Sequence, residues 1–150
     1  MPEMTRRTER RGVFNRRMAT SVFALVVLLG GAFYVSSRLT PNWNTASVTV
    51  DAAVREKFAS RAGFDPADSV IAFLTLGTRD GVEKVATLGP DRHGVVRVAL
   101  ILRVKAADGL ARRYDEMRVT KGADGLWTPV SWKSSRQDAD SVFWTRGPTQ

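Results

Sequence analysis

The longest uncharged stretch of the chain runs from Met18 to Val35, and two serines extend it up to Arg38. A helix over residues 18–37 would measure about 30 Å at about 1.5 Å per residue, which is the thickness of a bilayer's hydrocarbon core. The pattern therefore predicts a transmembrane helix over 18–37. A helix-breaking segment follows, and we expect Trp43 behind it to lie at the level of the lipid headgroups.

A secretory signal peptide is the alternative for this segment. Such peptides have an apolar core of about 7–15 residues and a cleavage site of small residues. The run in this chain is longer, and its best cleavage candidate, residues 35–37, departs from the A-x-A pattern. The sequence favours a retained anchor and leaves cleavage as the open alternative.

Arginine dominates the segment in front of the apolar run. Residues 1–17 carry six arginines and two glutamates, and Arg16 and Arg17 lie at the expected membrane boundary. By the positive-inside rule, residues 1–17 form a cytoplasmic basic arm, and the chain after Arg38 lies on the opposite side of the membrane. Half of the net charge of +8 belongs to this arm, so the charge is a topology signal and we expect no nucleic-acid partner.

The chain contains no cysteine. This excludes disulfides, thiolate catalysis, iron–sulfur clusters and most structural zinc sites. An exported domain without disulfides suits a bacterial periplasm better than a eukaryotic secretory route. We therefore expect a single-pass protein of the bacterial inner membrane, with its N-terminus in the cytoplasm and its C-terminal domain in the periplasm.

After an expected linker over residues 38–48, the pattern of apolar and polar residues is that of a globular domain. Apolar residues recur every four positions from Val50 to Phe58, which predicts a helix over 50–62 with one apolar face. Thr49 or Ser47 would cap its first turn.

From Ser69 onward, short apolar runs alternate with turn residues. With no room for crossover helices between them, these runs must form an antiparallel meander. The predicted fold class is thus α+β: an N-terminal transmembrane helix, then one small domain (49–134) of a helix packed on a curved antiparallel β-meander, and a C-terminal tail over 135–150. The expected strands cover residues 69–76, 82–88, 95–105, 110–120 and 126–134.

Two positions interrupt the alternation of the expected strands. Pro129 has no backbone donor, which predicts an edge position or a bulge. In the preceding strand the apolar residues Tyr114 and Met117 are an odd number apart, which predicts a bulge or strong bend near Asp115.

The end of the meander carries the sequence MRVT at 117–120, the turn KGADG at 121–125 and LWTPVSWK at 126–133. This closing hairpin resembles that of the VirB8-like and Mce-associated accessory proteins of bacterial envelopes, whose domains have NTF2-like or cystatin-like folds. The resemblance covers about a quarter of the chain and implies a tethered accessory role. It implies no catalytic residue.

Few residues suggest chemistry. His93 is the only histidine, and with Asp91 it flanks a turn at Gly94, where polar residues are routine. Asp115 and Glu116 are neighbours on an expected strand, so they would point to opposite faces and form a poor catalytic pair. We predict that the protein is not an enzyme and has no catalytic residue, metal site or cofactor.

Basic residues gather on two neighbouring strands of the expected meander. Because side chains alternate along a strand, they would form a positive patch for anionic headgroups or an acidic partner. The alternative is the ordinary polar side of a sheet that packs on one face. The residues of this candidate patch are Arg97, Arg103, Lys105, Arg112, Arg113 and Arg118.

Aromatic side chains are the second group of candidate contacts, since aromatic and arginine residues dominate the energetics of interfaces. Core packing is the better explanation for Trp127. The aromatic candidates for partner binding are Tyr114, Trp132, Phe143 and Trp144.

These expectations describe a non-catalytic accessory or scaffold subunit of a larger bacterial envelope complex for secretion, transport, respiration or photosynthesis. Its partners would be membrane lipids and other subunits. The alternative is a periplasmic module that binds a small ligand in a pocket between helix and sheet. A gap between Val54 and Phe58 on the helix and Val98 and Leu100 on the sheet would favour this alternative.

Overall fold

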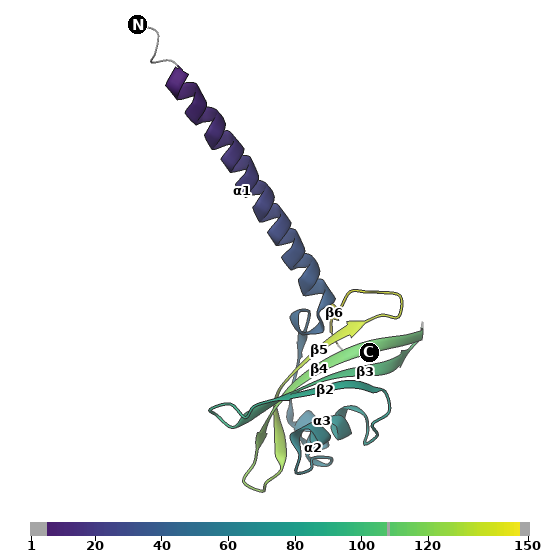
Figure 1. The fold of residues 1–150 in the computed structure, drawn as a ribbon. Coiled ribbons are helices and arrows are strands. Elements are labelled where there is room, and N and C mark those ends of the chain that lie inside the picture. The colour runs from purple at the N-terminus through teal and green to yellow at the C-terminus, as the bar shows by residue number, and fades with distance from the viewer. Residues whose placement is uncertain (1–5, 108, 148–150) are drawn as a thin grey trace. The chain divides into compact units, whose positions relative to one another are not determined.

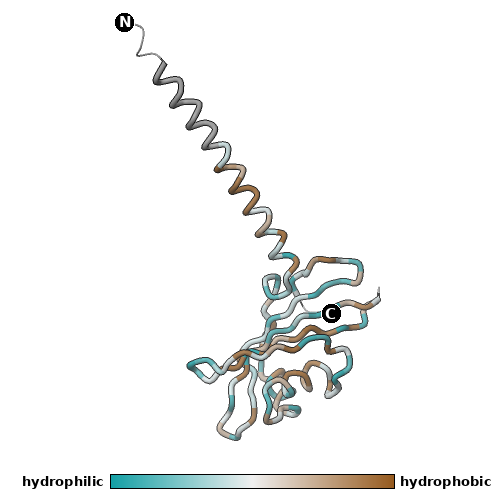
Figure 2. The backbone as a smooth tube through the Cα atoms, viewed as in Figure 1, coloured by the Kyte–Doolittle hydropathy of each residue, from teal (hydrophilic) through white to brown (hydrophobic). Residues whose placement is uncertain are grey.

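The computed structural model describes residues 6–107 and 109–147, with side chains from Thr20 onward. The chain forms two compact units, the first ending at Ser37 and the second beginning at Arg38. The first helix, α1, covers Arg6–Leu39. The segment Thr20–Leu39 of this helix is long and apolar enough to cross a membrane, and Figure 2 shows its apolar residues. A signal sequence meets the same criterion.

An antiparallel sheet forms the body of the second unit (Figure 1). In the described part of the chain it has six strands in the order β1-β5-β4-β3-β2, with β6 also paired to β5. The predicted α+β class and antiparallel meander are confirmed, while β1 and β6 add strands that the sequence did not predict. The strands are β1 (Ala46–Val48), β2 (Val82–Leu88), β3 (Val95–Ala106), β4 (Gly109–Lys121), β5 (Trp127–Gln137) and β6 (Thr145–Arg146).

The helix predicted over 50–62 is present but shorter: α2 covers Ala52–Ala59. Its N-cap is Asp51, whose carboxylate accepts a hydrogen bond from the backbone N–H of Val54 at 2.8 Å, and not Thr49 or Ser47. A carboxylate at this position satisfies a free N–H and interacts favourably with the helix dipole.

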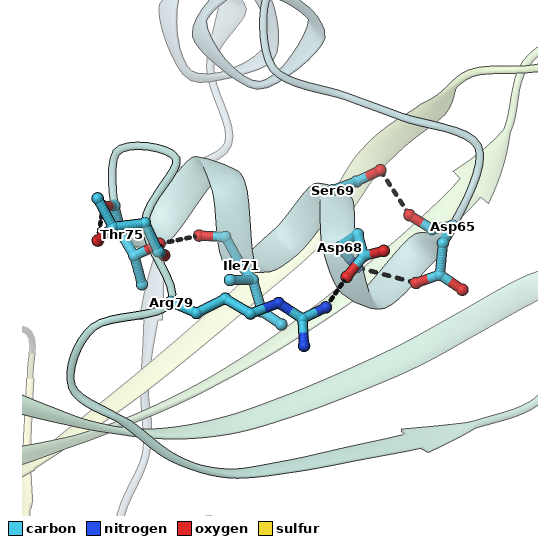
Figure 3. Close-up of polar contacts among 7 residues, drawn as sticks. Asp65, Asp68, Ser69, Ile71, Thr75 and Arg79 are labelled. Carbon is cyan, nitrogen blue, oxygen red and sulfur yellow. Dashed lines mark hydrogen bonds and ion pairs between the residues drawn. The ribbon is translucent and has the colours of Figure 1, made fainter.

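The strand predicted over 69–76 is wrong, because most of this segment belongs to a second helix, α3 (Pro66–Leu74). Asp65 caps it by accepting from the N–H of Asp68 at 2.9 Å (Figure 3). Pro66 occupies the first turn, where its missing N–H costs nothing. The hydroxyl of Ser69 also donates to the Asp65 carbonyl at 2.7 Å. A short apolar run does not distinguish a strand from a buried helix, and in this segment the N-cap residue Asp65 is the signal that favours a helix.

The two short helices pack on one face of the sheet, here called the inner face (Figure 1). Phe58 of α2 and Phe73 of α3 lie with ring centroids 5.3 Å apart, and Phe73 contacts Trp132 of β5 at 5.7 Å. Alternate residues of β3 from Val96 to Leu102 are buried in this cluster. The fully or nearly fully buried core residues include Phe58, Val70, Val96, Val98, Leu100, Leu102, Met117 and Val119.

The register of the sheet shifts between Val82 and Lys84 of β2 and again at Pro129 of β5. Arg118 pairs with Ser131 but the next residue, Val119, pairs with Pro129, so β5 carries one extra residue there. This confirms the bulge predicted from the proline. The bulge predicted near Asp115 is wrong, because pairing of β4 is continuous there with both neighbouring strands. Asp115 is instead a fully buried polar residue on the inner face, which explains why the apolar alternation breaks at this position.

Candidate docking face

The face of the sheet turned away from α2 and α3, here called the outer face, carries a row of basic side chains. Arg97 pairs with Arg118 across β3 and β4, and Arg103 pairs with Arg112. These arginines alternate with the buried core residues of the same strands, so they lie on the outer face, and all four are exposed. Lys105 is on the same face of β3 and is also exposed. The structure therefore brings together five of the six predicted patch residues.

Arg113 is separated from the other patch residues. It follows Arg112 directly in the strand and therefore points to the inner face. There its guanidinium forms an ion pair with the fully buried carboxylate of Asp115. The other carboxylate oxygen of Asp115 accepts a hydrogen bond from the indole N–H of Trp132 at 2.8 Å. Arg113 and Trp132 thus satisfy a buried acid instead of presenting a surface.

Glu83 neutralises one end of the outer face. Its carboxylate, only 17% exposed, forms ion pairs with both Arg103 and Arg112. The hydrogen bond from Arg103 is the main reason that the pKa of Glu83 lies below its usual value, and Arg112 lowers it further. These three residues line an open groove of about 920 Å³, together with Ile101 and Leu110.

Arg97 and Arg118 at the other end have no such partner. Among the described residues, neither guanidinium has a carboxylate within ion-pair distance. The nearby Glu116 accepts a hydrogen bond from the Tyr114 hydroxyl at 3.0 Å and pairs across the sheet with Lys133. Like charges directly opposite each other in a sheet are destabilising. Two like charges therefore lie opposite each other at exposed positions of the sheet without an ion-pair partner in the described part of the chain, although the charge of Arg118 contributes to the lowered pKa of Asp91.

The aromatic candidates divide into buried and exposed side chains. Tyr114 and Trp144 are both buried, although neither belongs to the core cluster under the helices. Burial is the main reason that the pKa of Tyr114 is raised above its usual value, and Glu116 raises it further. Trp132 is half-buried, whereas Phe143 is 45% exposed. Of the four aromatic candidates, Phe143 presents the most accessible ring.

The turn before β3 uses its polar residues to hold the backbone. One carboxylate oxygen of Asp91 accepts from the N–H of His93 at 2.8 Å and from that of Val95 at 3.0 Å. These hydrogen bonds, that from Val95 foremost, lower the pKa of Asp91. The imidazole of His93 accepts from the Arg92 guanidinium at 3.1 Å. This is the solvated turn that the sequence predicts.

Three candidates for membrane contact lie near or within α1. The side chains of Arg16 and Arg17 lie outside the described part of the structure. Trp43 belongs to a short 3₁₀ helix, η1 (Pro41–Trp43), and is 53% exposed.

Sequence analysis did not single out Glu83, since an isolated glutamate in an edge strand has no distinguishing pattern.

Comparisons of the chain with protein-family models, with curated proteins and with solved structures find no match in any of the three. The resemblance of the hairpin at 117–133 to VirB8-like and Mce-associated proteins therefore stays a prediction.

Proposed function

We propose that the protein is a non-catalytic, single-pass accessory or scaffold subunit of a larger bacterial envelope complex, and that it docks through its outer face onto an acidic surface of another subunit. The N-terminal arm lies in the cytoplasm and the second unit in the periplasm. The apolar length of Thr20–Leu39 supports the anchor, and the six arginines in front of it support this orientation.

The observation that carries the docking proposal is that Arg97 and Arg118 lie opposite each other on neighbouring strands and neither has an ion-pair partner among the described residues. An isolated sheet would be more stable with a neutral or oppositely charged pair at these positions. Arginine forms planar, bidentate hydrogen bonds with carboxylates, and it is enriched among the residues that dominate interfaces. A carboxylate of the partner between the two guanidinium groups would relieve their repulsion.

The alternative, a ligand pocket between helix and sheet, finds less support. Phe58 of α2 and Val98 and Leu100 of β3 are fully or nearly fully buried in one cluster, and Val54 packs against it. The residues that would line such a pocket contact one another or the same neighbours. The groove described above lies on the other side of the sheet, beside Glu83.

The test is purification of the tagged full-length protein from its native membranes in a mild detergent. We expect a stoichiometric complex with the wild-type chain and its loss with the double variant Arg97→Glu/Arg118→Glu. The matched control is Arg55→Glu/Lys57→Glu, which changes the charge by the same amount at exposed positions of α2.

The outcomes separate the possibilities. Loss of the complex with the sheet variant but not with the helix variant supports docking through the outer face. Equal loss with both variants would point to a general effect of charge and contradict the assignment of the site. A wild-type chain that purifies as a monomer at its own mass would contradict the subunit proposal itself.

A further inference from the structure

We propose that the second unit also contacts the membrane directly, through four exposed apolar side chains that lie in the headgroup region of the bilayer. These side chains, here called the apolar rim, are Leu39, Trp43, Val142 and Phe143. The inference rests on the proposed membrane anchoring but is independent of the docking partner.

Two segments far apart in the sequence form the apolar rim. The backbone N–H of Trp144 donates to the carbonyl of Arg38 at 2.9 Å. Ser135 of β5 links the same two segments, because its hydroxyl donates to the carbonyl of Pro41 at 3.0 Å and its backbone pairs with Arg146 of β6. Residues 38–43 and 141–146 therefore lie side by side at one end of the sheet.

The four side chains are exposed, and they come from two segments that lie side by side. Their exposed fractions are 46% for Leu39, 53% for Trp43, 65% for Val142 and 45% for Phe143. Single exposed apolar residues are ordinary, but four of them on two adjoining segments favour an interaction surface there.

The segment that presents Val142 and Phe143 is held by its own hydrogen bonds. The N–H of Ser141 donates to the carbonyl of Asp138 at 3.1 Å, and the N–H of Phe143 donates to the hydroxyl of Ser141 at 3.0 Å. The next residue, Trp144, is buried, and Thr145 and Arg146 after it pair with β5. The two apolar side chains are thus held outward by structure on both sides.

Chain continuity identifies a lipid surface as the occupant. The second unit begins at Arg38, directly after the apolar segment that ends the first. Trp43 follows the end of the candidate span at Leu39 by four residues, so it lies no more than about 14 Å from that end. Aromatic residues are enriched at this level of a bilayer, where an apolar ring and a polar edge are both accommodated.

The contact would rest on apolar insertion more than on charge. Arg38 and Arg146 flank the rim, but Asp140 lies next to the same segment and Asp138 forms an ion pair with Arg136. Burial of apolar side chains in the interface is insensitive to salt, unlike attraction between exposed charges. The contact should therefore form on neutral as well as anionic membranes.

The experiment uses the natural absence of cysteine in the chain. Full-length Val142→Cys protein carrying an environment-sensitive fluorophore is reconstituted into phosphatidylcholine vesicles, with and without phosphatidylglycerol. Two other single-cysteine variants are controls: Leu28→Cys within the candidate span, and Phe64→Cys, at a position that is 81% exposed on the loop before α3. Quenching by nitroxides on the lipid and by iodide in the water is measured for each.

We expect the label at position 142 to be quenched by lipid nitroxides and shielded from iodide in both kinds of vesicle and at high salt, as at position 28. The label at position 64 should show the opposite pattern. A label at 142 that behaves like that at 64, while position 28 lies in lipid, overturns the contact but leaves the anchor. If the label at position 142 is shielded from iodide only with phosphatidylglycerol and at low salt, the contact depends on charge attraction and not on apolar insertion. This result would also overturn the proposal. If position 28 itself is in water, the proposed anchoring fails.

Discussion

The backbone N–H of Trp144 donates a hydrogen bond of 2.9 Å to the carbonyl of Arg38, so the start of the second unit and its C-terminal segment are joined. The indole of Trp144 is 4% exposed, whereas the adjacent ring of Phe143 is 45% exposed. Two aromatic residues with the same apparent status in the sequence therefore have different roles: one stabilises the domain and the other is available for contacts.

This difference predicts a large contrast in stability. Trp144→Ala should lower the free energy of unfolding by about 3 kcal/mol, because it empties a buried site. Phe143→Ala should cost less than about 1 kcal/mol, because much of its ring is already in water. Urea unfolding of the full-length protein in detergent, followed by circular dichroism, measures both. Equal losses from the two variants would show that the C-terminal segment does not pack as described.

The sequence predicts β2 to β5 well, misses the short strands β1 and β6, and predicts a strand where α3 lies. The strands β2 to β5 show alternation or clear turn residues, and β3 follows the period of two over most of its length. The apolar residues of α3, in contrast, form one short run in which helix and strand look alike. The decisive signal was Asp65-Pro66, a cap followed by a proline in the first turn.

The candidate site was predictable only in part. Alternation places Arg97 and Arg103 on one face, but the pairing of Arg97 with Arg118 depends on strand register, which the sequence does not specify without the turn geometry. Arg113 shows the limit most clearly. It lies beside Arg112 in the sequence and on the opposite face of the sheet, where a buried acid holds it.

The cap of α3 can be tested directly. Asp65→Ala should lower the free energy of unfolding by about 1 kcal/mol, since it leaves the N–H of Asp68 without its acceptor. Asp65→Asn should retain most of the stability, because asparagine caps as well as aspartate. Thermal unfolding of the two variants provides the comparison. A stable Asp65→Ala protein would indicate that packing alone holds this helix.

The buried acid Asp115 predicts an asymmetry between its own replacement and that of its partner. Asp115→Ala should cost about 3–5 kcal/mol, since it leaves the Arg113 charge and the Trp132 N–H with no acceptor in a buried site. Trp132→Phe should cost about 1–3 kcal/mol, because only one hydrogen bond to a buried group is lost. Unfolding by denaturant measures each variant, and the double variant gives their coupling. An additive double variant would argue against the contact.

Glu83 predicts a dependence of stability on pH. Its pKa is lowered in the folded protein by Arg103 and Arg112, so its stabilising contribution is present above the unfolded value of about 4.3 and is lost as the pH falls through the lower, folded value. Glu83→Gln should therefore destabilise the protein at pH 7 by about 1 kcal/mol, a modest amount because both arginines are exposed. Melting temperatures of the two proteins should converge as the pH falls through the folded pKa of Glu83. A constant difference across this range would exclude the charge as its cause.

The unpaired couple on the outer face predicts that stability and docking oppose each other. Arg97→Thr removes the repulsion from Arg118 and introduces a residue that favours strands, so it should raise the free energy of unfolding by about 0.5 kcal/mol. The same change should weaken the complex with the acidic partner, because a desolvated arginine contact is lost. Arg103→Thr is the matched control on the same strand and should instead lower stability, since Glu83 then loses a partner. Unfolding and co-purification of both variants decide the matter. If Arg97→Thr is destabilising and leaves the complex intact, the couple belongs to the ordinary polar side of the sheet and the docking face lies elsewhere.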